Sequence, residues 1–248
     1  MLKVLIFFCI ILPSAMAEIK NLRNESQLSM IKTGGNTNVQ AYNVKTQTKF
    51  DIGKYVYTLS GHYFLSLYEI VNGAGKTVDV ESARNWDLAM KTEKVLNERY
   101  NIYSQVQMEG DKFSGYNQRD NYGFGTKYKI IQTKEERFYT EIGYRYSVEH
   151  KTTTSENTNP VVISNKGRLY LAYEKQHSKA LSYKTGLEYL PNFTDGVDYM
   201  VSLDPSFTLL LTNIFSLKFS YKGTYDNSPA DENNKIDFKY VSTIIAKY

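Results

Sequence analysis

From about Asn24 to the C-terminus, apolar and polar residues alternate with a period of two, the pattern of β-strands with one apolar and one polar face. Between Tyr100 and Asp111, for example, Tyr100, Ile102 and Met108 share one face, and mainly polar side chains fill the other. No segment shows a helical period, no linker divides the chain, and only the first run has poorly separated faces. We count twelve runs, at residues 24–33, 38–50, 55–70, 80–96, 99–113, 119–131, 137–150, 166–176, 181–190, 197–211, 215–226 and 235–248.

The connections between the runs alternate in length. Those after even-numbered runs are tight turns, at residues 51–54, 97–98, 133–136, 178–179 and 212–213. Several after odd-numbered runs are longer, at residues 71–79, 151–165 and 227–234. This asymmetry is typical of up-and-down transmembrane barrels, whose short turns face the periplasm. An even number of strands then places both termini on the periplasmic side.

Run length and aromatic placement favour a transmembrane barrel over a soluble one. Several runs extend over 12 to 16 residues, whereas soluble strands usually have about 5–6 and a tilted strand crosses a bilayer with about 9–11. Aromatic rings also recur on the apolar face beside the tight turns, where they can lie at a membrane interface. They are Phe50, Tyr55, Tyr57, Tyr100, Tyr128, Phe138, Tyr173, Tyr183, Phe215 and Tyr248. The sequence therefore predicts an all-β, single transmembrane antiparallel up-and-down barrel of about twelve strands.

The N-terminal segment has the features of a signal peptide. Lys3 gives it a positive start, residues 4–12 form an apolar core too short to span a bilayer, and Ala15-Met16-Ala17 matches a cleavage site. We therefore predict a signal peptide at residues 1–17 and an outer-membrane barrel domain at residues 18–248.

Charge and cysteine content exclude several classes of protein. The chain has 30 Lys and Arg against 26 Asp and Glu, a formal net charge of +4. These charges are dispersed, so we expect no nucleic-acid partner. The single cysteine, Cys9, lies in the predicted signal peptide, so the mature chain is expected to have neither a disulfide nor thiol chemistry.

The last run resembles the terminal strand that outer-membrane barrels present to their assembly machinery. Tyr240, Ile244, Ala246 and Tyr248 form its apolar face, and Tyr248 is the last residue of the sequence. We therefore expect two kinds of partner: outer-membrane lipid and, during biogenesis, the barrel assembly machinery. We expect the folded protein to be a monomer.

Four patches of sequence also carry a resemblance to a known family. They are Gly34-Gly35-Asn36-Thr37-Asn38, Glu109-Gly110-Asp111-Lys112-Phe113-Ser114-Gly115-Tyr116, Leu190-Pro191-Asn192-Phe193 and Tyr225-Asp226-Asn227-Ser228-Pro229. In this order, over roughly residues 24–248, they resemble domain-of-unknown-function 481, described as salt-induced outer-membrane proteins. The resemblance implies an outer-membrane β-barrel, and it supplies no activity and no catalytic motif.

The three histidines are the obvious candidates for chemistry, and none has the partners that an enzyme would need. His62 falls on the polar face of its run and is expected to face the lumen, whereas a lipid hydrolase needs its histidine towards the bilayer. His150 lies beside Glu149 at a strand end, and His177 lies in a tight turn. No histidine or acidic cluster has the spacing of a metal site. We expect no catalytic residue, cofactor or metal.

The predicted inner face carries interleaved charges of both signs. We expect acids and bases to offset each other in a charge network that joins neighbouring strands. Single strands also carry both signs, as Glu141 with Arg145 and Asp237 with Lys239 show. A selective pore would instead show a ring of one sign. The network residues are Lys127, Lys129, Glu141, Arg145, Arg168, Glu174, Lys184, Glu188, Asp198, Asp204, Lys218, Lys222, Asp237 and Lys239.

The sequence thus predicts a non-enzymatic outer-membrane barrel, exported by a cleaved signal peptide. It would act either as a narrow, weakly selective channel or as a structural envelope protein, with a role linked to salt or osmotic stress. Two alternatives stay open. One is an outer-membrane hydrolase of the phospholipase or protease type, and the other is a soluble periplasmic β-barrel binding protein.

Overall fold

The computed structural model describes residues 18–33, 38–71, 73, 75–152, 160–229 and 234–247. Within these ranges the chain forms thirteen strands and one short 3-10 turn, η1(Lys112–Ser114), and no helix long and apolar enough to cross a membrane is found. The strands are β1(Ile19–Thr33), β2(Val39–Ile52), β3(Tyr55–Val71), β4(Thr77–Val95), β5(Tyr100–Asp111), β6(Tyr116–Gln132), β7(Glu136–Lys151), β8(Val161–Gln176), β9(Leu181–Pro191), β10(Tyr199–Leu203), β11(Ser206–Leu210), β12(Phe215–Asp226) and β13(Ile236–Lys247).

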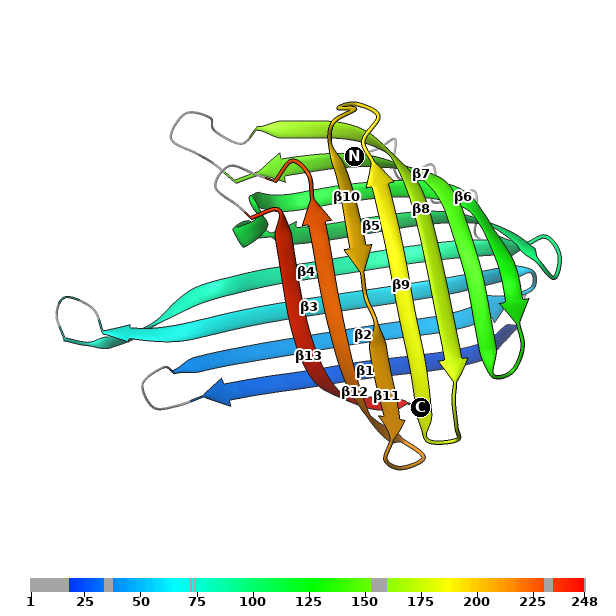
Figure 1. Cartoon of the computed structure of the whole chain (residues 1–248), viewed down its shortest axis with the longest axis horizontal. Helices are drawn as coiled ribbons and strands as arrows, with labels where there is room; N and C mark the ends of the chain where they lie inside the picture. Colours follow the sequence, from blue (N-terminus) through cyan, green and yellow to red (C-terminus); the bar gives the residue numbers. More distant parts are fainter. Residues whose placement is uncertain are drawn as a thin grey trace.

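The strands form one antiparallel sheet that closes on itself. Neighbours pair in sequence order, and β13 pairs with both β12 and β1 (Figure 1). β10 and β11 are two halves of one strand, because the register against β9 and β12 does not change between Leu203 and Ser206. Pro205 interrupts the ladder there, since it has no N–H to donate. The result is a closed barrel of twelve spanning strands, which confirms the predicted fold class.

Short turns and longer loops occupy opposite ends of the barrel. The turns that precede β3, β5, β7, β9 and β12 lie at one end, where β1 begins and β13 ends (Figure 1). The connections that precede β2, β4, β6, β8, β10 and β13 lie at the other end. The predicted alternation in connection length is therefore confirmed, and we call the two ends the turn end and the loop end.

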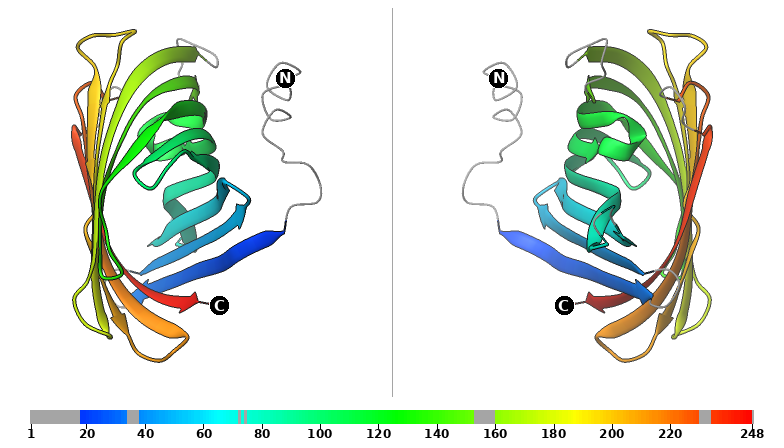
Figure 2. Two further views of the ribbon diagram at one scale, coloured as in Figure 1. Left: turned by 90° about the vertical axis from the view of Figure 1, so that its right-hand side faces the viewer. Right: turned by 90° about the vertical axis from the view of Figure 1, so that its left-hand side faces the viewer.

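Alternation along each strand sorts side chains between the two surfaces of the barrel. Ile142 on the outer surface is 62% exposed, whereas the adjacent Glu141 on the inner surface is 1% exposed. The same contrast separates Phe124 and Ile102 outside from Asn101 inside. The sheet, whose curvature Figure 2 shows, therefore has polar side chains on its inner surface and apolar ones on its outer surface, the inverse of a soluble barrel.

Aromatic rings meet one another near the turn end, as the sequence predicts. The chain of contacts passes between neighbouring strands, so that the rings form arcs of a belt at one level of the barrel. The pairs are Phe50–Tyr57, Tyr100–Tyr128, Phe138–Tyr173, Tyr173–Tyr183 and Tyr183–Phe207. Tyr248, expected in the same belt, lies outside the described residues.

The start of the first strand is irregular. β1 begins at Ile19, before the run at residues 24–33, and its register against β2 shifts between Lys20 and Arg23. Asn21 lies in this irregularity with φ of 52°. An irregularity of this kind reverses the alternation of faces, and it lies before the first run, because the register is continuous from Arg23 to Thr33. Within that run the adjacent Met30 and Ile31 are 61% and 52% exposed, so apolar residues occur on both faces.

The predicted assembly signal lies on the outer surface of β13. Tyr240 is 74% exposed and Ile244 is 56% exposed. Ala246 follows on the same face, opposite Phe215 of β12. Tyr248 is outside the described part of the chain.

Three of the family-like patches shape the loop end. Asp111 accepts hydrogen bonds from the N–H groups of Phe113 and Ser114 at 3.1 Å, which caps η1. Asn192 accepts from Thr194 N–H at 2.9 Å, and Asp226 accepts from Ser228 N–H at 3.0 Å. Such local bonds fix turn conformations. Residues 34–37 of the remaining patch lie outside the described residues.

Candidate functional site in the lumen

Ion pairs centred on Glu141 join the inner surfaces of several strands. Oε1 of this β7 carboxylate lies 2.5 Å from Lys91 Nζ on β4 and 3.7 Å from Lys127 Nζ on β6. Its Oε2 lies 2.7 Å from Arg168 Nη1 on β8. One buried carboxylate therefore compensates three cations contributed by three other strands.

Two further acids extend these contacts around the wall. Glu93 on β4 lies 3.2 Å from Lys127 Nζ, and it accepts a hydrogen bond from the Asn101 amide at 2.9 Å. Glu188 on β9 lies 2.5 Å from Arg168 Nε and 3.2 Å from Arg145 Nη2. We call this set the ion-pair wall, consisting of Lys91, Glu93, Lys127, Glu141, Arg145, Arg168 and Glu188.

Tyrosines fill the spaces between these charges. The hydroxyl of Tyr103 accepts a hydrogen bond from Arg168 at 3.1 Å, and Lys91 Nζ lies 4.5 Å from the centre of its ring. The ring reaches across Gly125 and Gly143, where a Cβ on either glycine would collide with the hydroxyl. Glycine is required at these two positions because Tyr103 occupies the space that a larger residue there would need for its own side chain.

A separate cluster lies nearer the loop end. Arg119 on β6 places Nη2 2.5 Å from Glu149 and Nη1 3.4 Å from Glu109, and its guanidinium lies 4.0 Å from the centre of the Tyr116 ring. The hydroxyl of Ser147 donates to the Asn121 amide oxygen at 2.6 Å beside it. This part of the lumen wall is also filled with matched polar groups.

The opposite side of the lumen is hollow. A cavity of about 600 Å³ extends from the turn end, at Glu135 and Lys175, to Asp87 and Lys222 further along the barrel. Its walls come mainly from β1, β2, β8, β9, β11, β12 and β13. The open volume therefore lies beside the ion-pair wall rather than within it.

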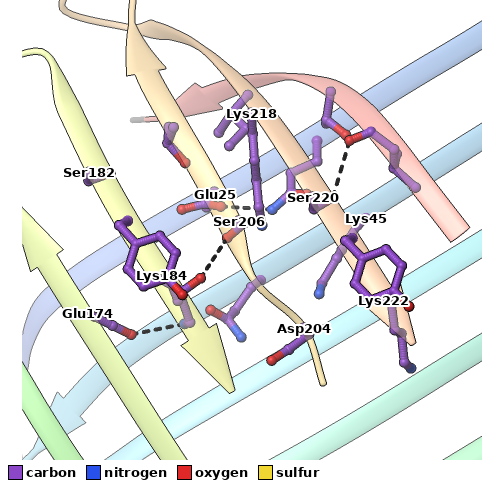
Figure 3. Close-up of a pocket in the computed structure, with 18 of the residues that line it drawn as sticks. Glu25, Lys45, Glu174, Ser182, Lys184, Asp204, Ser206, Lys218, Ser220 and Lys222 are labelled. Carbon is purple, nitrogen blue, oxygen red and sulfur yellow. Dashed lines mark hydrogen bonds and ion pairs between the residues drawn. The ribbon is translucent and has the colours of Figure 1, made fainter. Parts of the chain in front are cut away.

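Lysines dominate the inner part of this cavity. Figure 3 shows Lys45, Lys184, Lys218 and Lys222 around the same hollow, with Asp204 among them, and Lys239 also lines it. We call these five lysines the lysine side. Lys184 is paired with Glu174 at 2.9 Å. Within the described ranges, no ion pair is found for Lys45, Lys222 or Lys239.

The structure divides the residues of the predicted network between these two environments. Some lie close together on the ion-pair wall, some line the cavity, and a few lie apart from both. Lys127, Glu141, Arg145, Arg168 and Glu188 belong to the ion-pair wall, and Glu174, Lys184, Asp204, Lys218, Lys222 and Lys239 line the cavity.

The remaining three residues have different surroundings. Lys129 lies opposite Tyr139 of β7 and makes no ion pair within the described part of the chain. Asp198 lies in the loop before β10 and accepts a hydrogen bond from the Asn192 amide at 2.7 Å. Asp237 is exposed near the loop end of β13.

The charge partners differ from those expected along single strands. Glu141 contacts cations of β4, β6 and β8, and Arg145 contacts Glu188 of β9. Residues four apart on one strand are separated by about 13 Å, whereas neighbouring strands lie only about 4.8 Å apart. Partners on other strands are therefore within reach of Glu141 and Arg145, whereas these two residues of β7 are too far apart to pair with each other. Residues two apart on one strand can meet, as Lys91 and Glu93 do on β4 at 3.6 Å.

Sequence reasoning did not single out Arg119 or the inward tyrosines Tyr103, Tyr139 and Tyr170. Their positions were available from the alternation, because Arg119 has the parity of Lys127 and Tyr139 that of Glu141. The expectation that aromatic rings gather on the outer face obscured these inward rings.

The histidine with the most polar surroundings is held within the wall. His62 faces the lumen, as predicted, with Nδ1 3.3 Å from Asp87 and Nε2 2.7 Å from the amide oxygen of Asn43. Both ring nitrogens are thus engaged by neighbouring strands, and neither contact is to a nucleophilic hydroxyl.

Comparison with known proteins gives a family and a fold. The family model described as "Protein of unknown function, DUF481" matches residues 26–248. No curated protein matches the sequence.

Two solved structures share the architecture. A NanC porin has a TM-score of 0.52 at 8% sequence identity, covering 91% of this chain and 98% of that one. The COG4313 outer membrane channel from Pseudomonas putida F1 has a TM-score of 0.50 at 11% identity, covering 96% and 100% of the two chains. At such identities the likeness concerns the fold, which is that of outer-membrane channel barrels.

Proposed function

The chain belongs to the family described as Protein of unknown function, DUF481, and we propose that it is a narrow, non-enzymatic channel of the bacterial outer membrane. The observation that carries this proposal is the cavity of about 600 Å³ that extends along the lysine side from the turn end. A barrel with only a structural role in the envelope could fill its lumen with side chains throughout, whereas this lumen contains an open cavity beside the ion-pair wall.

The outer surface supports residence in a membrane. Apolar side chains such as Ile142, Phe124 and Leu88 are largely exposed in the middle of their strands, where water would disfavour them. The aromatic belt at the turn end marks an interface. The fold is that of outer-membrane barrels, so the bacterial outer membrane is the membrane we propose.

The contacts of His62 support a non-enzymatic role. A hydrolase would need its histidine beside a hydroxyl or a bound water in an accessible pocket. His62 lines the cavity, but both of its ring nitrogens are engaged by Asp87 and Asn43 on neighbouring strands. Its role in this proposal is to hold the wall together.

Conductance of the purified protein in planar bilayers tests the channel. We expect discrete, small conductance steps, because the ion-pair wall fills a large part of the lumen. Reversal potentials across a salt gradient should show a modest preference for anions, because more basic than acidic side chains line the cavity. Absence of steps at high salt would favour a structural envelope protein, and a strong cation preference would contradict the assigned conduction path.

The orientation can be tested separately by single cysteines. We propose that the turn end faces the periplasm. Val197→Cys, at a loop-end residue that is 71% exposed, should react with a membrane-impermeant thiol reagent on intact cells. Lys179→Cys, in an exposed turn between β8 and β9, should react only after the outer membrane is permeabilised. The reverse result would invert the proposed topology.

A further inference from the structure

Two lysines face each other directly across neighbouring strands of the cavity wall. Lys222 of β12 and Lys239 of β13 are register partners, and both line the cavity. Like charges directly opposite each other in a sheet repel and destabilise the pairing. A stable barrel that keeps this pair needs something that offsets the repulsion.

A third lysine approaches the same pair from another strand. Lys45 of β2 lines the cavity and interacts electrostatically with Lys222, and Lys239 interacts with both. The three ammonium groups therefore come from β2, β12 and β13, which surround one part of the hollow. Lys239 also lies 5.4 Å from the centre of the Phe64 ring, which limits where its ammonium can lie.

The acids that face these lysines are held by other contacts or stand off. Asp87 attracts Lys45 and Lys239, and it is in contact with His62 at 3.3 Å. The Asp204 carboxylate lies over Gly186, where a Cβ would collide with it, and it attracts Lys45 and Lys222 without contacting either. Asp111 attracts Lys239 from β5. Neither these acids nor any other in the described ranges forms an ion pair with Lys45, Lys222 or Lys239.

The cations of the ion-pair wall are paired, unlike these three lysines. Each has a carboxylate within 4 Å, as Arg168 has Glu141 and Glu188. The same barrel thus places acids in contact with its packed cations and leaves three cations directed into open volume. A solute can supply the missing negative charge at that point.

We propose that Lys45, Lys222 and Lys239 form a binding site for a small organic anion that carries two or more carboxylate or phosphate groups. The inference rests on the proposed channel function, because the anion reaches the site through the cavity. Lysine binds such groups as a point charge rather than through a planar fork, so the site selects for charge more than for shape. A cavity of about 600 Å³ has the size of small-molecule sites.

Block of the chloride current by citrate tests the site. Citrate added to wild-type channels in planar bilayers should reduce the current in a saturable way, whereas acetate at equal ionic strength should not, because one carboxylate cannot engage three lysines. The double variant Lys222→Gln and Lys239→Gln should raise the half-blocking concentration of citrate about tenfold or more, because two of the three attractive charges are removed. Lys222→Arg with Lys239→Arg should keep the block.

A matched control removes two other lysines of the lumen. Lys49 of β2 and Lys129 of β6 are not among the cavity-lining residues, so Lys49→Gln with Lys129→Gln lowers the total charge equally and should leave citrate block unchanged. Equal weakening in both double variants would show a general charge effect and overturn the site. Chloride conduction without any citrate block would overturn the site and leave the channel intact.

A second measurement separates the site from conduction. If wild-type protein shows no chloride conductance, the channel proposal fails, and the site is tested by heat stability of the folded barrel on gels. Citrate should then raise the unfolding temperature of the wild type and of Lys49→Gln with Lys129→Gln, but not that of Lys222→Gln with Lys239→Gln. The absence of citrate stabilisation in the wild type would overturn the site. All variants are first checked for folding by their heat-modifiable gel shift.

Discussion

Glu141 shows how much one side chain contributes to the interior of the barrel. Replacing it by glutamine keeps its size and removes the charge that compensates Lys91, Lys127 and Arg168. Removing one partner of a buried ion pair costs about 3–5 kcal/mol. Lys91 and Lys127 keep Glu93, and Arg168 keeps Glu188, so the loss should fall at the lower end of that range. We expect Glu141→Gln to lower the free energy of unfolding by about this amount, measured by urea titration in detergent micelles.

A more exposed acid provides the control for that measurement. Glu174 pairs with Lys184 and Arg137, whose side chains are 51% and 56% exposed. Solvent screens such pairs, which contribute about 0–1 kcal/mol. Glu174→Gln should therefore change the stability little, and equal losses in the two variants would show that burial does not decide the strength of these ion pairs.

Two glycines on β6 differ in what surrounds them. A Cβ on Gly125 would collide with the carbonyl oxygen of Ile142 and come within 2.8 Å of the Tyr103 hydroxyl. At Gly123 the nearest atom is the Tyr144 carbonyl oxygen at 3.5 Å. Overpacking of a filled interior costs about 1–3 kcal/mol. We expect Gly125→Ala to lower the unfolding temperature and Gly123→Ala to leave it nearly unchanged, and the opposite order would contradict the position of Tyr103.

At this scale the sequence predicts on which side of the wall a residue lies, but not what it contacts. Alternation places Lys127, Glu141 and Arg168 inside without further information. The contact between Lys91 and Glu141 joins strands β4 and β7, which are not neighbours. It depends on how far each side chain extends into the lumen and on the curvature of the sheet, and the alternation of apolar and polar residues predicts neither.

The positions of the strands are predicted closely by the alternation of apolar and polar residues and by the turn residues between the runs. Departures occur where the backbone is irregular, as at Asn21 in β1 and at Pro205 between β10 and β11. A proline removes one ladder hydrogen bond, yet the register continues through it because pairs on both sides, Leu203–Leu187 and Ser206–Lys184, keep the strand in place. The alternation therefore counts twelve spanning strands correctly although the ladder is interrupted.

Strand β2 offers a test of which face meets lipid. Val44, in the middle of the strand, is 48% exposed on the outer surface, and Gln47 lines the cavity opposite Glu25. An arginine facing the middle of a bilayer costs about 2–4 kcal/mol. We expect Val44→Arg to reduce the folded fraction on heat-modifiable gels, whereas Gln47→Arg folds normally because it meets water and an acid. Normal folding of both variants would contradict the assignment of faces.

The charge distribution of the whole barrel depends on how its strands are matched around the circumference. The sequence places acids and bases on every part of the inner face, which predicts a uniform balance. In the structure, matched pairs gather on β4–β9, and lysines gather around the cavity between β2, β9, β12 and β13. The meeting of Lys222 with Lys239 is set by the register across the long connection before β13. Loop length alone does not specify that register.

Closure of the barrel rests on a short seam between its first and last strands. Four register pairs join β1 to β13, from Glu25–Lys247 to Leu28–Ile244. The Ser29 hydroxyl adds a hydrogen bond to the Ser242 carbonyl at 2.8 Å. An open edge in lipid would leave backbone groups without partners, so this seam decides whether the sheet is a barrel in the membrane.

Disulfide formation across the seam tests closure directly. Gln27 and Ile245 are register partners that both line the cavity, and opposed residues of neighbouring strands have Cβ atoms about 4.5–5.5 Å apart, close enough for a bond after a small adjustment. The only cysteine of the chain, Cys9, lies in the predicted signal peptide. We expect Gln27→Cys with Ile245→Cys to cross-link on mild oxidation of the folded protein, seen as a reductant-sensitive mobility shift after heat unfolding.

The control is Gln27→Cys with Val241→Cys, whose second cysteine lies on β13 about 13 Å from residue 245. This pair should therefore stay reduced. Cross-linking of the control in preference to the first pair would displace the register, and an absence of bonds in a folded first pair would mean that β1 and β13 do not meet.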